Sequence, residues 1–588
     1  MVGSRSKLLA FCFGTVLCAP LPAQVTERVD VAWNGAQSPG GGDLIPGASV
    51  SGDGRYVLFT ASSVLVPGDT NGTWDVFVRD RVTSTTERVS VATGGGQANG
   101  YSSLYGFWIT PNGRYVAFES SASNLVPGDT NGFSDVFLRD RVARTTERVS
   151  VATGGSEGNA QSWFPSVSAD GRYVAFTSLA STLVAGDTNG TFDVFLRDRL
   201  LGTTALVSAG MGGANGDSDS YVPVISADGQ FVAFESTASN LVPGDTNGTW
   251  DVFVWERLTG TMERVSVSTG GAQGNGVSSA AVISTDGRLV GFTSTAANLI
   301  PGDTNGAADA FVRDRQLGTT ERVSLNSAGG QINSDSGCGP LSTDGRLVVF
   351  GTGEVFIRDR VRGVTELVTV STGGAHANGA SAYASMSSDG RYVAFRSSAS
   401  NLVAGDTNGR DDVFLHDRNA TGFRSQCWPG VSGVVACPCS NPPSGPNRGC
   451  DNSSATGGAS LSASGNAYLS IDSVVFTTSG ERPTALSVLM QGSASLASGL
   501  LYGQGVRCAG GSTKRLFVKT AVGGSITAPN FVVGDSTVSA RSAAKGDVIQ
   551  PGQSRWYLVY YRDPIVLGGC SASSTFNATQ TGQVTWWP

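Results

Sequence analysis

Short apolar runs separated by glycine-rich turns recur along the first two thirds of the chain. In one unit, residues 166–168 lead to Asp170-Gly171, and the apolar segment 172–177 follows. An Asp-Gly pair between two such runs predicts a β-hairpin, and a continuous apolar run predicts a strand covered on both faces. A further strand pattern at 193–197 comes after a polar loop. The pattern predicts four antiparallel strands in each unit, the fourth beginning near Ala205.

This unit repeats along the chain. The Asp-Gly or Asn-Gly pair begins at residues 53, 112, 170, 228, 286, 344 and 389, so successive units lie 59, 58, 58, 58, 58 and 45 residues apart. Seven four-stranded units at a long, nearly fixed spacing predict a β-propeller with seven blades. A strand pattern at 26–31 precedes the first unit, whereas the seventh lacks a clear outermost strand. We predict that the N-terminal strand completes the seventh blade; the alternative is that residues 422–424 do so.

Two repeated motifs carry a family resemblance. Ser-x-Asp-Gly-Arg-Tyr-Val-Ala-Phe-x-Ser and Asp-Val-Phe-Val-Arg-Asp are similar to motifs of the WD40-like, TolB-like β-propeller repeat family of exported bacterial proteins, over about residues 26–418. The resemblance implies a β-propeller fold. It implies no single function, because this family includes scaffolds, binding proteins and a few enzymes.

The connections between strands predict which face of the propeller binds a ligand. The turns between the first and second strands and between the third and fourth are short, whereas the second-to-third loop and the blade-to-blade loop are long. Connections alternate between the two faces, so all long loops fall on one face, here called the long-loop face, where a rigid scaffold would hold a binding site. Some blade-to-blade loops carry aromatic residues that either stack on sugar rings or fill gaps between blades: Tyr101, Tyr105, Phe107, Trp108, Trp163, Phe164 and Tyr221.

Six of the second-to-third loops contain the motif Asp-Thr-Asn-Gly-x-x-Asp. Calcium takes six to eight oxygen ligands, and glycine permits the sharp turn of a binding loop. The motif is similar to the later part of the calcium loops of integrin-type propellers, but Pro67 stands where those loops begin with an acid. The two interpretations are a calcium site and a turn capped by its own side chains. The candidate calcium ligands are Asp69, Asn71, Asp75, Asp129, Asn131, Asp135, Asp187, Asn189, Asp193, Asp245, Asn247, Asp251, Asp303, Asn305, Asp309, Asp406, Asn408 and Asp412.

The repeat stops near Cys427, and short alternating segments with glycine turns follow. They predict a β-sandwich-like domain over residues 425–588. This region holds six cysteines: Cys427, Cys437, Cys439, Cys450, Cys508 and Cys570. An even number in an exported domain predicts disulfides. A zinc site at Cys437-Pro438-Cys439 is the alternative, although no histidine lies nearby.

The N-terminus predicts export. Arg5 and Lys7 precede an apolar run at 8–19 and a small-residue cleavage site, which is the pattern of a secretory signal peptide over residues 1–23. This run is too short to span a bilayer, and no later stretch is long and apolar enough, so we predict no membrane span. The propeller then occupies residues 24–424.

Charge and catalytic motifs narrow the function. Residues 24–426 hold 28 basic and 41 acidic residues, a net charge of −13, which argues against a nucleic-acid partner. The chain has only two histidines, His376 and His416, and no phosphate-loop motif. We predict an exported, non-enzymatic binding or scaffold protein with a protein or carbohydrate ligand on the long-loop face and calcium as a candidate stabilising ion. The alternative is a polysaccharide-acting hydrolase or lyase with carboxylates at the propeller channel.

Overall fold

The computed structural model describes residues 25–586 apart from residues 43–49, 352, 372–373, 419–423, 428, 431–433, 446–447, 465–466, 468, 470–471, 473, 551–552 and 566–574. The predicted signal peptide and the alternative closing segment at 422–423 lie outside the described residues. Residues 24–420 form one unit and residues 421–588 belong to a second, close to the predicted boundary.

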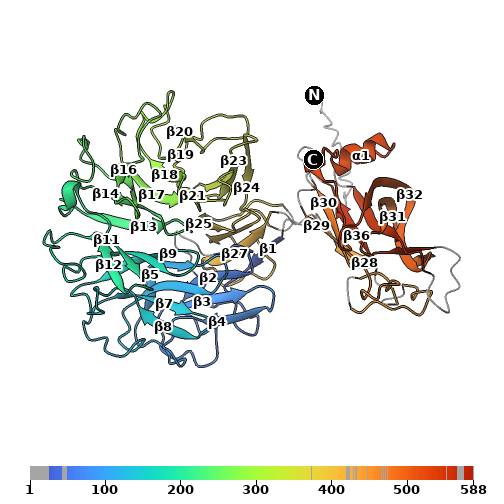
Figure 1. The fold of residues 1–588 in the computed structure, drawn as a ribbon, viewed down its shortest axis with the longest axis horizontal. Helices are drawn as coiled ribbons and strands as arrows, with labels where there is room; N and C mark the ends of the chain where they lie inside the picture. Colours follow the sequence, from blue (N-terminus) through green and yellow to red (C-terminus); the bar gives the residue numbers. More distant parts are fainter. Residues whose placement is uncertain are drawn as a thin grey trace, which may run out of the picture. The chain divides into compact units, whose positions relative to one another are not determined.

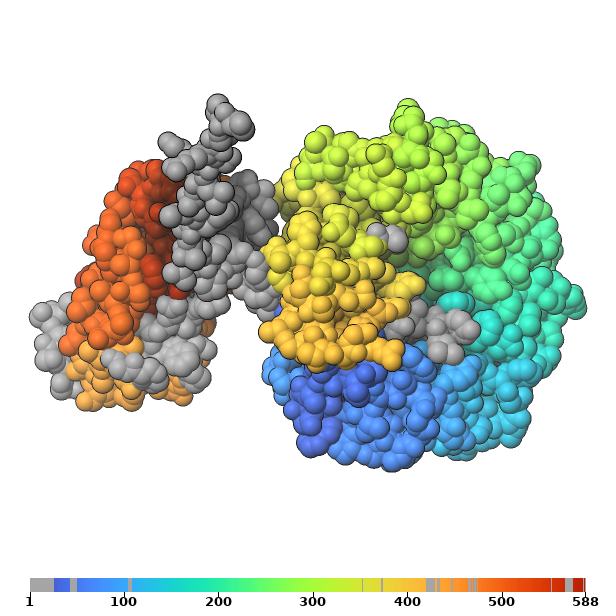
Figure 2. Space-filling view, turned by 180° about the vertical axis from the view of Figure 1, so that it is seen from behind, coloured from blue at the N-terminus to red at the C-terminus, as the bar shows by residue number. Residues whose placement is uncertain are grey.

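Seven antiparallel sheets follow one another around the first unit (Figures 1 and 2), which confirms the predicted seven-bladed propeller. The strands, from innermost to outermost, are β2 (Tyr56–Ala61), β3 (Asp75–Asp80) and β4 (Thr85–Arg88) in blade 1; β5 (Ser102–Ile109), β6 (Tyr115–Ser120), β7 (Asp135–Asp140) and β8 (Thr145–Arg148) in blade 2; β9 (Ser162–Val167), β10 (Tyr173–Ser178), β11 (Asp193–Asp198) and β12 (Thr203–Leu206) in blade 3; β13 (Ser220–Ile225), β14 (Phe231–Ser236), β15 (Asp251–Glu256) and β16 (Met262–Arg264) in blade 4; β17 (Ser278–Ile283), β18 (Leu289–Ser294), β19 (Asp309–Asp314) and β20 (Thr319–Arg322) in blade 5; β21 (Cys338–Leu341), β22 (Leu347–Phe350), β23 (Phe356–Asp359) and β24 (Val364–Leu367) in blade 6; and β25 (Ser381–Met386), β26 (Tyr392–Ser397), β27 (Asp412–Asp417) and β1 (Val25–Arg28) in blade 7. In blade 1, Val50 bridges Val57 at the innermost position. A short 3₁₀ turn, η1 (Met211–Gly213), lies between blades 3 and 4.

The N-terminal strand closes the ring, as predicted. β1 pairs antiparallel with β27, with Val25 opposite Asp417 and Arg28 opposite Phe414. The first blade therefore lies beside the last in the space-filling view (Figure 2). This pairing covers the edge of β27 that would otherwise remain open.

The Asp-Gly-Arg-Tyr motif joins each blade to the next. Gly54 adopts φ 71°, and a Cβ at this glycine would lie 1.9 Å from the ring of Tyr392 in blade 7. In the same way a Cβ at Gly171 would lie 2.3 Å from the ring of Tyr115 in blade 2. Glycine is required because it allows both the left-handed turn and the close approach of the tyrosine ring.

Ion pairs reinforce the contact between blades at the outer strands. An arginine that follows the third strand of one blade binds a glutamate in the outermost strand of the blade before it. The pairs are Arg81–Glu27, Arg141–Glu87, Arg199–Glu147, Arg315–Glu263, Arg360–Glu321 and Arg418–Glu366. Between blades 3 and 4 the glutamate position holds Ala205, and Arg257 Nε instead donates to the Gly229 carbonyl at 2.8 Å.

The second unit contains two sheets that share one core, which confirms the predicted sandwich-like domain. The larger sheet has the order β28 (Arg424–Cys427), β36 (Thr581–Thr585), β34 (Ser554–Arg562), β31 (Leu486–Tyr502) and β32 (Gly505–Thr520), with β35 (Phe576–Ala578) on β34; the smaller has β29 (Ser460–Ser464), β30 (Val475–Ser479) and β33 (Thr527–Ala528). The turn η2 (Phe531–Val533) and the helix α1 (Val538–Ala544) follow β33. Phe476 from the smaller sheet contacts Tyr557 from the larger one, with ring centroids 4.5 Å apart.

The predicted disulfides are present in the described part of the second unit. Cys437 and Cys450 are joined to each other, and Cys439 and Cys508 each take part in a disulfide bond. Cys338 in the propeller is free and buried. Among the described residues, no helix is long and apolar enough to cross a membrane.

Candidate functional site

The six Asp-Thr-Asn-Gly-x-x-Asp loops lie between the second and third strands of blades 1 to 5 and 7. The second aspartate of each loop opens the third strand and is fully buried. In blade 1, Asp75 accepts hydrogen bonds from Ser90 Oγ at 2.6 Å and from Asn71 Nδ2 at 2.9 Å. The same asparagine-to-aspartate bond recurs in the other loops, from Asn131, Asn189, Asn247, Asn305 and Asn408 to Asp135, Asp193, Asp251, Asp309 and Asp412.

An arginine from the outermost strand bridges the two aspartates in five of these loops. In blade 1, Arg88 Nη1 lies 3.0 Å from Asp69 Oδ1 and 3.3 Å from Asp75 Oδ2. The other four arginines lie 3.0 to 3.5 Å from their two carboxylates: Arg148 with Asp129 and Asp135, Arg264 with Asp245 and Asp251, Arg322 with Asp303 and Asp309, and Arg28 with Asp406 and Asp412. In blade 7 the arginine comes from β1, so this loop also holds the ring-closing strand.

The donor set of these five loops does not fit calcium. A guanidinium group already lies against both carboxylates, and the asparagine directs its amide nitrogen, a hydrogen-bond donor, to the second aspartate. Burial raises the pKa of Asp129 to about 6, and Asp135 adds to this shift although Arg148 opposes it. Each of these five loops is therefore an ion-pair cluster that ties the outermost strand to the loop.

The loop of blade 3 is different, because Leu206 stands at the position of the arginine. Among the residues that the structure describes, no guanidinium group forms an ion pair with Asp187 or Asp193. Burial raises the pKa of Asp193 to about 6 and also raises the pKa of Asp187.

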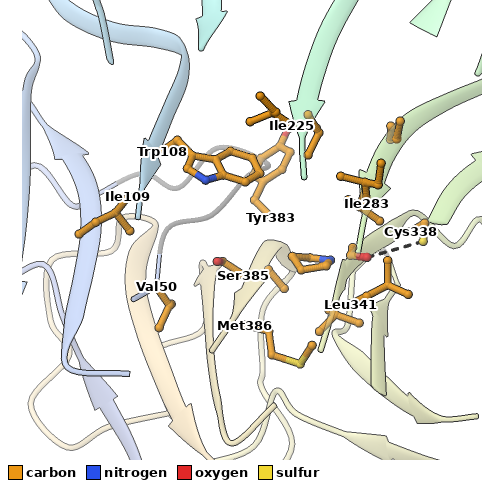
Figure 3. Close-up of a pocket in the computed structure, with 18 of the residues that line it drawn as sticks. Val50, Trp108, Ile109, Ile225, Ile283, Cys338, Leu341, Tyr383, Ser385 and Met386 are labelled. Atoms are coloured by element: carbon orange, nitrogen blue, oxygen red, sulfur yellow. Dashed lines mark hydrogen bonds between the residues drawn. The ribbon is translucent and has the colours of Figure 1, made fainter. Parts of the chain in front are cut away.

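A cavity of about 470 Å³ occupies the centre of the propeller, and residues of all seven blades line it. Figure 3 shows part of this lining. Its apolar lining includes Trp108, Ile225, Ile283, Leu341 and Met386. Among the described lining residues there is no aspartate, glutamate, histidine, lysine or arginine. Burial raises the pKa of the Cys338 thiol to about 12, so this cysteine stays protonated and is a poor nucleophile.

Bulges in the innermost strands shape this cavity. Phe164, Val222, Ala280 and Tyr383 line it with φ angles between 50° and 54°, in the left-handed region that residues other than glycine rarely adopt. The register of each strand shifts at this point. Glu235 Oε2 in blade 4 accepts a hydrogen bond from Ala280 N at 3.0 Å, so the preceding blade supports the bulge. Strained backbone of this kind is often found at ligand-binding sites.

The two ends of the channel differ. At the end with the short Asp-Gly turns, the residues that follow the innermost strands of neighbouring blades hydrogen-bond to one another. Gly52 N donates to Pro111 O at 2.8 Å, Ala169 N to Ala227 O at 2.9 Å, and Thr343 N to Ser388 O at 2.8 Å. The bulges lie near the beginning of each innermost strand, toward the long-loop face. The channel is therefore drawn together at the short-turn end.

The predicted aromatic residues divide into two groups. Trp163 stacks on Phe192 at 5.3 Å, Phe192 contacts Tyr221 at 4.8 Å, and Tyr221 contacts Trp250 at 5.7 Å, so these rings tie blades 3 and 4 together. Trp108 and Tyr383 line the channel (Figure 3), and Tyr383 is 46% exposed. Phe164 also lines the channel, and its ring meets that of Tyr221 edge-on, with centroids 6.4 Å apart. The Tyr101 hydroxyl group contacts Ser134 Oγ at 2.9 Å. The side chains of Tyr105 and Phe107 lie outside the described residues.

Sequence reasoning missed the bridging arginines and the apolar channel. A signal for the arginines was present, because an arginine follows the second aspartate by 13 residues in blades 1, 2, 4 and 5. Phe192 and Trp250 also precede their aspartates by one residue. The channel gave no comparable signal, because its lining residues differ from blade to blade.

Comparisons with known proteins concern the fold. No family model and no curated protein matched the chain. Among solved structures, the chain is similar to an oligogalacturonate lyase in complex with manganese, at 13% identity over 68% of this chain and 96% of that chain, with a TM-score of 0.43. It is also similar to a putative TolB from Agrobacterium tumefaciens, at 19% identity over 53% of this chain and 88% of that chain, with a TM-score of 0.32. TolB from Acinetobacter baumannii is 16% identical over 62% of this chain and 80% of that chain, with a TM-score of 0.30.

These likenesses are too distant to indicate an activity. The seven sheets of the first unit and their closure by β1 establish the propeller architecture. The protein is a seven-bladed β-propeller joined to a disulfide-containing β-sandwich-like domain.

Proposed function

We propose that this is an exported, non-enzymatic binding protein that takes an apolar segment of a partner protein into its central channel from the long-loop face. The observation that carries this proposal is the 470 Å³ channel, lined by apolar side chains and shaped by four strained bulges. A cavity of this size with mainly apolar walls is typical of a ligand site.

The chemistry of the channel favours apolar peptide side chains over a sugar as the buried group. A sugar presents many hydroxyl groups that need hydrogen-bond partners, and the described lining offers few polar side chains, among them Thr285, Thr343 and Ser385. Trp108 and Tyr383 provide aromatic surface for an aliphatic or aromatic side chain. Backbone hydrogen bonds draw the strands together at the short-turn end, which supports entry from the long-loop face.

The predicted alternative, a polysaccharide-acting enzyme with channel carboxylates, lacks support from this site. Glycosidases of that kind use a pair of carboxyl groups beside the substrate. The described residues that line the channel include no carboxylate, so the site favours binding over catalysis. Export is supported by the disulfides of the second unit, because such bonds persist in oxidising compartments.

A peptide-display experiment tests the proposal. A random-peptide library panned on the purified full chain is expected to yield peptides rich in apolar and aromatic residues. A fluorescent copy of a selected peptide should then bind with lower affinity to Ala280→Phe, by about tenfold or more. This substitution places an aromatic side chain in the channel. Phe164 and Tyr383, at the corresponding bulges of two other blades, show that the backbone accepts such a side chain there.

The matched control is Val361→Phe, in the turn between β23 and β24, where Val361 is 78% exposed. This variant should bind the peptide like the wild type. Equal binding by Ala280→Phe and the wild type would place the ligand elsewhere. Binding to a glycan array, with no peptide enriched, would favour a carbohydrate ligand and overturn the proposal.

A further inference from the structure

The second unit carries an apolar turn that is exposed to solvent. In η2, Val532 is 96% exposed and Val533 is 68% exposed, and Phe531 before them is exposed as well. Large apolar residues that are exposed singly are common on protein surfaces, whereas a contiguous group of them marks an interaction site. The turn is therefore a candidate contact surface.

Hydrogen bonds hold this turn in shape. Asn530 Oδ1 accepts from Val532 N at 3.1 Å. Gly534 ends the turn with φ 82° and donates to the Phe531 carbonyl at 3.1 Å. Asp535 Oδ2 accepts from Asn530 N at 2.7 Å. The backbone thus keeps the apolar side chains on the outside of the domain.

Positive charge is concentrated in the same part of the chain. Residues 514–555 contain six basic and two acidic residues, a net charge of +4. The rest of residues 427–588 contains four basic and four acidic residues, so its net charge is zero. Lys514, Lys519 and Lys545 are the only lysines of the chain apart from Lys7. The segment around the exposed turn therefore accounts for the whole net charge of this region.

Two of the basic side chains lie close to the turn. Lys519 Nζ lies 2.5 Å from Asp535 Oδ2, the oxygen that also accepts the hydrogen bond from Asn530 N. The pKa of Asp535 is below its usual value: burial raises it, but the hydrogen bond from Asn530 and the charges of Lys519 and Arg541 outweigh burial. Two cations therefore act on one carboxylate, which leaves an excess of positive charge beside the turn.

Two further lysines approach each other after α1. A Cβ at Gly546, which follows Lys545, would lie 3.9 Å from Lys514 Nζ. Asp547, the second acidic residue of the segment, is bound by Arg555, with 2.7 Å between Arg555 Nη2 and Asp547 Oδ1. Since each acidic residue of the segment already has a basic partner, Lys514 and Lys545 add net positive charge to this surface.

Two features favour a lipid surface over a protein partner. The turn projects into solvent, and a protein would need a matching pocket to cover it, whereas lipid headgroups give way to apolar side chains. Lysine combines an apolar stem with a charged end, so it reaches the phosphate groups of anionic lipids beside an inserted apolar turn. The arrangement fits a membrane surface of negative charge.

We propose that the second unit binds the surface of an anionic lipid membrane. The apolar side chains of η2 enter the headgroup region, and Lys514, Lys519 and Lys545 contact lipid phosphate groups. The domain then lies on the membrane without crossing it. The proposal concerns the second unit and is independent of the ligand of the channel.

Co-sedimentation of the purified full chain with lipid vesicles tests this proposal. The chain should bind vesicles of equal parts phosphatidylcholine and phosphatidylglycerol at least about tenfold more tightly than vesicles of phosphatidylcholine alone, and added salt should weaken this binding. Val532→Asp places a charge on the turn and should weaken binding to the anionic vesicles by about tenfold or more. The matched control is Val361→Asp, because Val361 is an exposed valine of the propeller, and it should bind like the wild type.

A second pair of variants tests the charge. Lys514→Gln combined with Lys545→Gln should weaken binding to the anionic vesicles by about tenfold, because each lysine near the surface adds to the attraction. Arg362→Gln removes an exposed positive charge from the propeller and should leave binding unchanged. Circular dichroism establishes that each variant is folded.

Three results would overturn the proposal: no binding of the folded wild type to the anionic vesicles, equal binding to both kinds of vesicle, or unchanged binding by folded Val532→Asp. Gel filtration adds a fourth. If the wild type self-associated while Val532→Asp stayed monomeric, and neither bound vesicles, the turn would bind a second copy of the chain and not a lipid surface.

Discussion

A guanidinium group between two buried carboxylates is the recurring polar contact of this propeller. Arg88 joins Asp69, at the start of its loop, to Asp75, at the start of the third strand. The contact fixes a long loop without any apolar core of its own. A buried ion pair contributes little more to stability than a hydrophobic contact of similar size. Removing only one of its two partners, however, leaves an unpaired buried charge and is strongly destabilising.

Replacing Arg88 with methionine is therefore expected to lower the free energy of unfolding by about 3 kcal/mol, measured by urea denaturation. The control is Arg362→Met. Arg362 lies 3.9 Å from Asp359, and its side chain is 45% exposed, so its loss should cost less than about 0.5 kcal/mol. Similar effects of the two substitutions would contradict the importance assigned to the buried bridge.

His416 gives the propeller a dependence on pH. Burial lowers the pKa of His416 to about 3, and Arg418 adds to the shift. The folded state thus binds a proton less readily than the unfolded chain. The contribution of the neutral ring to stability is complete above about pH 6.5 and is lost as the pH falls from about 6.5 toward 3.

The melting temperature of His416→Gln should therefore fall less than that of the wild type between about pH 7 and pH 4.5, by a few degrees. His376→Gln is the matched control, because the side chain of His376 is 72% exposed. This control should follow the wild type across the same range. If the melting temperature of His416→Gln depended on pH as that of the wild type does, protonation of His416 would not be a cause of the pH dependence.

The sequence motif identified the aspartates but not their partner. Asp69, Asn71 and Asp75 stand in one loop, so their proximity follows from the chain itself. Arg88 reaches them only because β4 pairs with β3 in a register that places Arg88 opposite Phe77. That register could not be assigned from the sequence alone, and the bridging role of the arginine became clear only in the structure.

The innermost strands combine regular pairing with a left-handed residue near their beginning. Val222 is the least expected of these residues, because a β-branched side chain disfavours positive φ. Its bulge separates the pair Tyr221–Glu235 from the pair Val224–Ala233. The displaced residue faces the channel, so the bulge changes the surface offered to a ligand while the rest of the strand keeps its place in the blade.

Val222→Gly is expected to leave the free energy of unfolding unchanged or to raise it by about 1 kcal/mol. Glycine relieves a backbone strain of about 1–3 kcal/mol, which offsets the larger entropy of the unfolded glycine chain. Val224→Gly, two residues along the same strand, should instead lower stability by about 2 kcal/mol or more, because Val224 is buried in regular strand geometry. Equal losses would show that the bulge stores no strain.

The presence and order of the strands could be predicted because the same motif occurs seven times. A strand assignment that is uncertain in one unit is then supported by the other units. The apolar segment predicted at 172–177 corresponds to β10 at Tyr173–Ser178. The bulges could not be predicted, because Phe164 and Val222 are common strand residues and their conformation depends on neighbouring blades. The channel, which these bulges shape, remained unpredicted for the same reason.

The two units of the chain are stabilised in different ways. Residues 24–420 rely on stacked blades and ion pairs, and their single described cysteine, Cys338, is free and buried. The second unit has disulfides, including one that links Cys437 and Cys450 across 13 residues. Such a link lowers the entropy of the unfolded chain and stabilises a small domain by about 3 kcal/mol.

Reduction should therefore act on one unit only. Calorimetry of the full chain is expected to show two transitions, of which dithiothreitol lowers one. Cys338→Ala tests the assignment, because this variant should respond to reduction like the wild type. A shift of both transitions on reduction would contradict the separate stabilisation of the two units.

The pairing of β1 with β27 also sets an order of events during synthesis. β1 is the first propeller strand to be made, yet its partner is completed only when Asp417 has been added. Thr26 and His416, which face each other across the closure, are 390 residues apart. Bringing chain segments so distant together costs about 5 kcal/mol of entropy in an otherwise unfolded chain, a cost that stacking of the intervening blades lowers. The first six blades can assemble before β1 pairs with β27. Ring closure therefore takes place only after the strands of all seven blades have been synthesised.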